Sequence, residues 1–359
     1  MKVNSLHYLR GILALGVMVY HYSSWPLGYG YYLNANNIIC RFGNFGVSLF
    51  FILSGLTLYH VYSGKTIFDA KNLKNYFIKR FFRIYPLLWI TTTISILFTR
   101  EIYDLKTIVL NLSGLFGFTE SNFAILKVAW SIGNEIVFYC AFPILLLLLQ
   151  QRNLIFKLIP VLLFLLSFYY GVAHVIRVTD DKLFSHDYYS PLNNFFFFIG
   201  GILIAFFTEK RSFPKWLLVS LLSVSVLLFL FYPVSGALSN LLTGNHRLLF
   251  SFMCFAICFT LYKLPYTLPS KLHSVFFMFG TISYSIYLLH PIVVNQLLAP
   301  WIWIESHYTD SFNPQLFFPI VLVECIVLSY FSYRFMEQPS IKLGNKLLLI
   351  RSFFSVKRS

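Results

Sequence analysis

The chain has 359 residues, of which 58% are hydrophobic and only 11% charged, and it contains 41 phenylalanines. This composition is typical of a protein whose solvent is lipid, and it excludes a soluble multidomain enzyme because no polar stretch between the apolar segments is long enough for a soluble domain. The formal net charge of +15 does not indicate nucleic-acid binding, since the basic residues lie between apolar segments rather than on one exposed face.

The apolar segments predict about ten transmembrane helices, because their lengths approach or reach the roughly 20 residues that a helix needs to cross a bilayer. The first segment is expected to be retained and not removed as a signal peptide. Lys2 is the only positively charged residue before it, and no small-residue cleavage site follows. We therefore expect an all-α polytopic membrane protein. The ten segments are residues 6–24, 44–62, 84–98, 130–149, 154–176, 191–207, 216–233, 247–262, 275–297 and 315–335.

The connections between these segments predict the topology. With the N-terminus inside, nineteen Lys and Arg residues fall on the inside and seven on the outside, the latter being Arg41, Arg100, Lys106, Lys127, Arg177, Lys182 and Arg247. Positively charged connections tend to stay cytoplasmic. This asymmetry predicts that both termini are cytoplasmic and that the protein is a multi-pass protein of the cytoplasmic (inner) membrane.

Three further segments have distinct characters. Residues 65–83 form the longest predicted basic loop, on the cytoplasmic side. Residues 103–120 are apolar but short for a crossing, which predicts an outer-face helix or a re-entrant segment packed against protein. We expect residues 1–340 to form one transmembrane domain and residues 341–359 to form a short basic cytoplasmic tail.

The five cysteines show no spacing typical of a metal site, and all but Cys40 lie in predicted spans. A thiol in such a position usually behaves as a small apolar side chain. The sequence therefore predicts neither a disulfide framework nor a bound metal.

Ionisable side chains inside apolar spans are the strongest indication of function, because each is costly in hydrocarbon. Arg10 and His21 lie in the first span, and eleven residues of helix bring them to nearly the same face about 16 Å apart. Glu135, His290 and Glu324 are the other ionisable residues well inside predicted spans. Together they predict a polar path through the membrane domain.

Histidine is the commonest general base, and it contributes roughly 10² to 10⁴ in rate when it is positioned against a hydroxyl proton. We predict this role for His21, with Glu135 or Glu324 orienting the imidazole. Arg10 either forms a structural pair with a glutamate or stabilises charge that develops on a bound acyl donor. For His290, an acceptor-side contact and a role in capping its span are both open.

Six blocks in chain order resemble the membrane-bound acyltransferase-3 family, whose members move acyl groups, usually acetyl, onto carbohydrate hydroxyls. The resemblance covers nearly the whole chain. The blocks are YLRGILALGVMVYH at 8–21, FGVSLFFILSGL at 45–56, YFIKRFFRIYPLLW at 76–89, WSIGNEIVFYCAFP at 130–143, ISYSIYLLHP at 282–291 and YRFMEQP at 333–339.

The resemblance assigns expected roles to individual residues. It implies that His21 is the catalytic histidine and that Arg10 belongs with it. The family's cytoplasmic arginine pair, Ser-Gly pair and Trp-Ser…Glu block are matched here by Arg80 with Arg83, Ser54 with Gly55, and Trp130 with Ser131 and Glu135. Of these we expect Arg80, Arg83, Ser54 and Trp130 to bind the donor and Glu135 to act in catalysis. A guanidinium pair suits the phosphates of acetyl-CoA because each group offers bidentate donors.

The hypothesis is an O-acyltransferase that carries acetyl from cytoplasmic acetyl-CoA to a hydroxyl of a surface polysaccharide or its lipid-linked precursor. Transfer is direct in the simplest mechanism, and an acyl-histidine on His21 is the alternative. A transporter or flippase that uses Arg10, His21, Glu135 and Glu324 as a proton or anion path is the main rival. A non-enzymatic glycan-binding partner ranks last. The expected partners are acetyl-CoA, a glycan acceptor and membrane lipids, with no nucleic acid.

Overall fold

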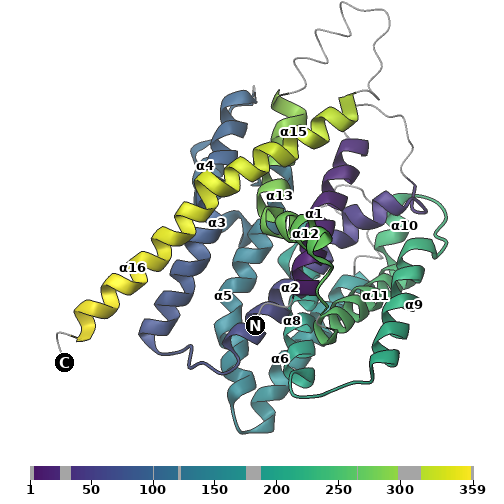
Figure 1. The fold of residues 1–359 in the computed structure, drawn as a ribbon, viewed down its shortest axis with the longest axis vertical. Coiled ribbons are helices and arrows are strands. Elements are labelled where there is room, and N and C mark those ends of the chain that lie inside the picture. Colours follow the sequence, from purple (N-terminus) through teal and green to yellow (C-terminus); the bar gives the residue numbers. More distant parts are fainter. Residues whose placement is uncertain are drawn as a thin grey trace, which may run out of the picture.

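A computed structural model describes residues 4–24, 34–99, 101–119, 123–174, 187–264, 266–297 and 317–356 of the chain. Within these residues the regular structure is entirely helical (Figure 1). The predicted all-α class is therefore confirmed. Parts of the predicted outer connections, including Arg100, Arg177 and Lys182, and the last three residues of the predicted tail lie outside the described residues.

Helices occupy all ten ranges that the sequence predicted as spans. They are α1 (Asn4–Ser24), α2 (Ile38–Tyr62), α3 (Ala70–Phe98), α5 (Trp130–Gln150), α6 (Leu154–Tyr169), α8 (Pro191–Thr208), α9 (Lys215–Phe231), α11 (Gly244–Lys263), the pair α12 (Ser270–Thr281) and α13 (Ser283–Ile292), and α15 (Phe317–Ser332). Shorter helices are α4 (Leu105–Ser113) and α10 (Leu238–Leu242), and α16 (Gln338–Val356) ends the described chain.

Among the described residues, seven helices are long and apolar enough to cross a membrane, and an eighth span results if α12 and α13, which meet at 59°, are taken together. Helix α9 is apolar but has only 17 residues. The multi-pass class is thus confirmed with seven or eight such spans, fewer than the ten predicted. The side on which each terminus lies remains a prediction.

The prediction of a basic loop at residues 65–83 is wrong over most of that range, because helix α3 already begins at Ala70. Residues 70–83 contain neither glycine nor proline, so nothing in the sequence interrupts the helix before Pro86. A membrane helix can extend beyond its apolar part, and hydropathy located only that apolar part. Arg80 and Arg83 therefore project from a helix instead of a loop.

Two arginines assigned to outer connections lie inside helices instead. Arg41 belongs to α2 and Arg247 to α11, and their exposed fractions are 1% and 2%. Arg41 donates to the carbonyls of Phe229 (2.9 Å) and Tyr232 (2.6 Å) at the end of α9. The cause is again an early helix start, since α2 begins at Ile38 and not near residue 44.

The short apolar segment at 103–120 contains a helix, α4, and packs against protein. Helix α4 ends at Gly114, whose positive φ of 71° suits glycine, and a 3₁₀ turn follows at Leu115–Gly117. Side chains of α3 hold the end of α4, because Tyr85 donates to the Ser113 carbonyl (2.8 Å) and Trp89 to the Leu112 carbonyl (2.6 Å).

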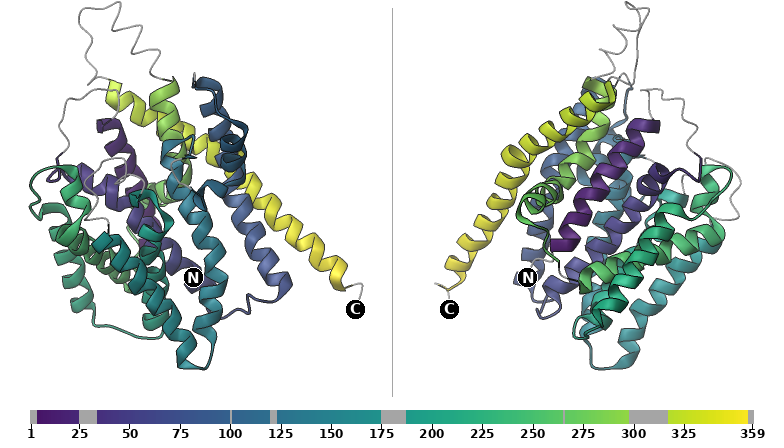
Figure 2. Two further views of the ribbon diagram at one scale, coloured as in Figure 1. Left: turned by 180° about the vertical axis from the view of Figure 1, so that it is seen from behind. Right: turned by 45° about the vertical axis from the view of Figure 1, so that its right-hand side comes forward.

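Helix α2 lies at the centre of the bundle, between α1 and α8 (Figure 2). Glycines let its backbone approach α8 closely: a Cβ on Gly55 would lie 2.0 Å from the Phe198 carbonyl oxygen, and one on Gly201 would lie 2.1 Å from that of Ile52. Small residues at a crossing permit such approach in membrane proteins, where packing rather than hydrophobic exclusion holds helices together. This crossing fixes the positions of the site residues on α2.

The predicted basic tail forms a helix over most of its length. Helix α16 continues the direction of α15 beyond the π-helical turn Tyr333–Glu337 and runs diagonally along one flank of the bundle (Figures 1 and 2). It packs on α3, where Gly344 faces the ring of Phe82. The segment that follows the last predicted span is thus in contact with the helix that carries Arg80 and Arg83.

Replacing Gly55 or Gly201 with alanine should destabilise the bundle, because the added methyl meets a backbone carbonyl that cannot move independently. We expect a loss of about 1–3 kcal/mol for each, measured as a lower midpoint of thermal unfolding in detergent. Gly64→Ala is the matched control, since nothing lies within 4 Å of its would-be Cβ. Equal midpoints for all three variants would contradict this account of the crossing.

Candidate functional site

Two adjoining cavities lie inside the helical bundle. The first cavity, of about 80 Å³, is lined by α1, α2, α3, α5 and α13. The second cavity, of about 400 Å³, is lined by the first turns of α1, the last turns of α2, and parts of α3, α11, α12, α13 and the region from Tyr333 to Ile341. Both share the side chains of Arg10, Arg83, Ser283 and Tyr284. The two spaces therefore meet at a boundary marked by two guanidinium groups.

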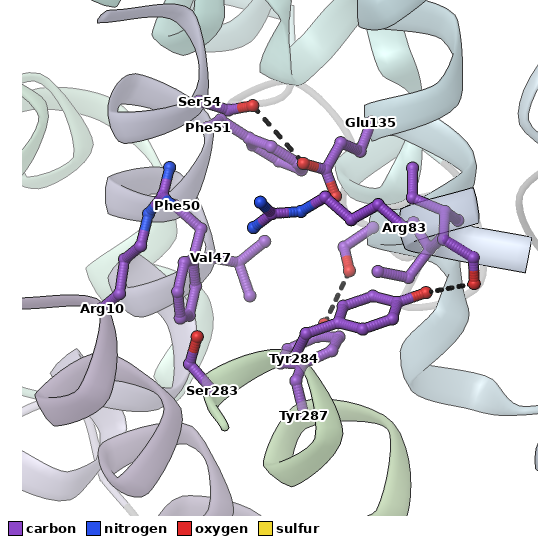
Figure 3. A pocket seen from close by; sticks show the side chains of 13 residues that line it. Arg10, Val47, Phe50, Phe51, Ser54, Arg83, Glu135, Ser283, Tyr284 and Tyr287 are labelled. Carbon is purple, nitrogen blue, oxygen red and sulfur yellow. Dashed lines mark hydrogen bonds between the residues drawn. The ribbon is translucent and has the colours of Figure 1, made fainter. Parts of the chain in front are cut away.

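Apolar and polar side chains are intermixed around the first cavity (Figure 3). The apolar lining residues are Val47, Phe50, Phe51, Ile84 and Ile132, and the polar ones are Arg10, Ser54, Arg83, Ser131, Glu135, Ser283, Tyr284 and Tyr287. An apolar lining with a few convergent polar groups is typical of a small-molecule site.

Arg10 and Arg83 enter the first cavity from opposite sides, from α1 and α3 (Figure 3). The Arg10 Nη2 atom donates to the Thr57 hydroxyl at 3.1 Å. In the part of the chain that the structure describes, no carboxylate forms a salt bridge with either guanidinium. Most of their donors thus remain directed at the cavity, where a ligand with anionic or carbonyl oxygens can accept them.

Glu135 lies on α5 at the edge of the first cavity, and neutral donors hold its carboxylate. The hydroxyl of Tyr139, one turn further along α5, donates to it through a short hydrogen bond, and Ser54 donates to it from α2 at 3.4 Å. The carboxylate is thus fixed by hydroxyls instead of an arginine. With two guanidiniums and one carboxylate, the first cavity carries a formal positive charge.

The predicted arginine pair on α3 is split between two environments. Arg83 lines both cavities, whereas Arg80 lines neither. The Arg80 guanidinium instead lies over the rings of Tyr139 (5.4 Å) and Tyr76 (5.8 Å). Such cation–π contacts are typical of a packed guanidinium. Arg10, and not Arg80, is the arginine that faces the first cavity together with Arg83.

His21 lies near the other end of α1 and outside the lining of both cavities. Its Nδ1 atom is 3.0 Å from Nε2 of His290 on α13, and the two rings stack with centroids 4.9 Å apart. From the sequence, Glu135 or Glu324 was expected to orient His21. The structure instead places Glu135 against Ser54 and Tyr139, and Glu324 on α15, where it lines neither cavity.

Trp130, at the start of α5, also lies outside the lining of the two cavities. Its exposed fraction is 8%, and its ring packs against Tyr189 (centroids 4.8 Å apart), Tyr188 (5.7 Å) and Phe51 (6.4 Å). The next residue, Ser131, does line the first cavity. Trp130 therefore packs behind the wall of the first cavity.

Several polar residues in or near the cavities were not assigned to the site from the sequence, and two of them are ionisable residues on the C-terminal side of the site. One is His290, which the sequence analysis named without linking it to His21. The other is Glu337, in the π-helical turn Tyr333–Glu337, which is 5% exposed, lines the second cavity and accepts a short hydrogen bond from Ser285. Glu337 lies two residues beyond the last predicted span, so it was not among the ionisable residues assigned to spans. Its burial in the π-helical turn is evident only from the structure.

Comparison with known proteins identifies a family whose model matches most of this chain. The family model described as an acyltransferase domain matches residues 3–334. Two Staphylococcus aureus proteins named as putative O-acetyltransferases, from strains MRSA252 and COL, are each 27% identical and align with 96% and 95% of this chain. The O-acetyltransferase OatA of S. aureus strain NCTC 8325 / PS 47 is 25% identical over 94% of this chain. No solved structure matches.

The relatives are longer than this chain. The aligned region covers 58% and 57% of the two proteins from strains MRSA252 and COL and 57% of OatA. The chain thus spans a little over half the length of these relatives.

Proposed function

The chain belongs to the acyltransferase family defined by this domain, and from this premise we propose that it transfers an acetyl group from acetyl-CoA to a hydroxyl of a surface polysaccharide or of its lipid-linked precursor. The observation that carries the proposal is the first cavity, where Arg10 and Arg83 face one space of mixed polarity. O-acetyltransferase names among the relatives agree with this reaction class.

On the donor side, the second cavity is the larger and is lined by the first turn of α1 and the last turn of α2. The predicted topology places these ends at the cytoplasm, where acetyl-CoA is available. We assign the nucleotide part of acetyl-CoA to the second cavity and the narrower pantetheine arm to the first. Arg83 and Arg10 then bind phosphate or carbonyl oxygens at the boundary between the two.

On the acceptor side, His21 is the general base. It removes the proton of the acceptor hydroxyl, the hydroxyl oxygen attacks the thioester carbonyl carbon, and the C–S bond breaks as the C–O bond forms. The sulfur of CoA leaves as a thiolate and takes up the proton. Arg10 binds oxygens of the donor on the cavity side of the acetyl group, while Glu135 and Ser54 belong to the polar lining of the first cavity.

Arg83→Gln should raise the KM for acetyl-CoA by about tenfold or more, because a charge-assisted hydrogen bond contributes about 1.5–3 kcal/mol. Arg80→Gln is the matched control on the same helix, three residues away. It should leave this KM within about threefold and act on stability instead, since its guanidinium packs on Tyr76 and Tyr139. The measurement is acetyl transfer from labelled acetyl-CoA by purified protein in lipid nanodiscs. Equal KM values for both variants would remove the assignment of Arg83.

His21→Ala should abolish acetylation while the protein remains in the membrane, because the reaction loses its base. His246→Ala is the control: this half-buried histidine on α11 lies beside Tyr232 and away from both cavities. The measurement is mass analysis of surface glycans from cells that express each variant or lack the protein. Acetylated glycan in the His21→Ala cells at the wild-type level would refute the role of this residue.

Purified protein in sealed lipid vesicles separates the enzyme from a transporter or flippase. An acyltransferase turns over acetyl-CoA and modifies a glycan hydroxyl. A transporter would instead move a glycan or acyl compound across sealed vesicles without consuming acetyl-CoA. Vesicle transport without acetyl-CoA turnover would therefore replace our proposal with that of a transport path through Arg10, His21 and Glu135.

A further inference from the structure

A third cavity, of about 540 Å³, lies at one end of the bundle and shares no lining residue with the first two. It is lined by the last turn of α2, the first turns of α6, the last turn of α8 and the residues that follow α8. The α5–α6 and α8–α9 connections lie at this same end of the bundle (Figure 1). The third cavity is therefore a separate space from the one assigned to the acetyl donor.

Most of the wall of the third cavity is apolar. Leu154 and Leu158, one turn apart on α6, line it together with Phe207 on α8, and these side chains remain 66%, 46% and 49% exposed. Among the helices that are long and apolar enough to cross a membrane, the one that begins at Leu154 is the least buried, at 17%. Exposed apolar side chains on such a helix face lipid. An alkyl chain from the bilayer can therefore pack along this wall.

Three basic side chains line the same cavity: Lys157 on α6, and Lys210 and Arg211 just after α8. Within the described residues, no carboxylate forms a salt bridge with any of them. Glu209 is the acidic residue of the lining, and its carboxylate lies 3.3 Å from Nδ1 of His60 on α2. The lining therefore has a formal charge of +2, from three cations and one carboxylate.

We propose that the third cavity binds an anionic phospholipid, whose phosphate lies among Lys157, Lys210 and Arg211 and whose acyl chain packs along the apolar wall of α6 and α8. Ammonium and guanidinium groups form charge-assisted hydrogen bonds with phosphate oxygens. The apolar wall accounts for the chain and the cations account for the headgroup, so both parts of one molecule are matched. Basic pockets between membrane helices on the cytoplasmic side suit such headgroups, and the predicted topology places this end of the bundle there.

Positively charged residues also gather at cytoplasmic helix ends for reasons of topology alone, and two neighbours allow the two explanations to be separated. Arg152 precedes α6 and Lys215 begins α9, so both lie on the same two connections as the cavity cations. Neither lines the third cavity. Topology alone treats all five basic residues alike, whereas a lipid site depends on the three that line the cavity.

The test measures binding of phosphatidylglycerol to the purified full chain in uncharged detergent micelles by native mass spectrometry. We expect wild-type protein to bind one lipid saturably. The triple variant Lys157→Gln/Lys210→Gln/Arg211→Gln should bind it about a hundredfold more weakly, because each basic group contributes about fivefold. The double variant Arg152→Gln/Lys215→Gln is the matched control and should stay within about twofold. Equal affinities for the two variants, at equal midpoints of thermal unfolding without added lipid, would overturn the proposal.

A second pair of variants tests the acyl chain while it keeps all three cations. Leu158→Trp places a larger side chain in the cavity and should weaken binding about tenfold. Leu162→Trp, one turn further along α6, is the control, since Leu162 is 56% exposed and does not line the cavity. Its affinity should equal that of wild type. Wild-type affinity in the Leu158→Trp protein as well would contradict the placement of the chain.

Competing ligands distinguish a phospholipid from other sources of phosphate or of alkyl chains. Phosphatidylcholine with the same acyl chains should bind at least tenfold more weakly than phosphatidylglycerol, because its choline group offsets the phosphate charge. Equal binding of the two lipids would show that the cavity recognises only the chains. Glycerol 3-phosphate and CoA lack an acyl chain and should not displace bound phosphatidylglycerol. Displacement by either would assign the cavity to a soluble phosphate compound and refute the proposal.

Discussion

An arginine inside an apolar bundle has to find acceptors within the protein, because the bilayer supplies no water to solvate it. Four arginines meet this constraint in two ways. Arg41 and Arg247 are buried and donate to backbone carbonyls, which satisfies their donors and ties helices together. Arg10 and Arg83 face shared cavities instead. The first pair is structural because backbone carbonyls accept its hydrogen bonds. The second pair, apart from the bond of Arg10 to Thr57, faces open space where a bound ligand can accept.

The carboxylates of the site do not cancel this positive charge. Glu135 accepts from Tyr139 and Ser54, and Glu337 accepts from Ser285. Hydroxyls therefore satisfy both carboxylates, although each borders a cavity that also contains Arg83. Had either glutamate formed a salt bridge with Arg83, binding an anionic donor would first require that bridge to break, at a cost of several kcal/mol for a buried pair. Hydroxyl partners keep the arginine available and still hold the carboxylates in place.

Sequence reasoning predicted the class and the helices well, because hydropathy is a local property of each segment. It placed the start of α3 too late, since the polar residues before Ile84 continue the helix beyond the apolar part. Within the site, the choice between Arg80 and Arg83 depends on the rotation of α3: three residues turn a helix by about 300°, so the two side chains point about 60° apart. The contact between His21 and His290 joins residues 269 positions apart, and no pattern in a single sequence encodes such a distance.

The helices around α1 connect Arg10 and His21, which lie far apart along α1 itself. A distance of about 16 Å along one helix is too long for a direct hydrogen bond, so the two residues need other elements between them. The structure provides those elements: α2 and α3 close the first cavity around Arg10, and α13 leads from that cavity through Tyr287 to His290 and His21. Because Tyr287 and His290 both lie on α13, this helix connects the wall of the first cavity with the histidine pair. The route from Arg10 to His21 therefore runs through a neighbouring helix and does not depend on a contact within α1.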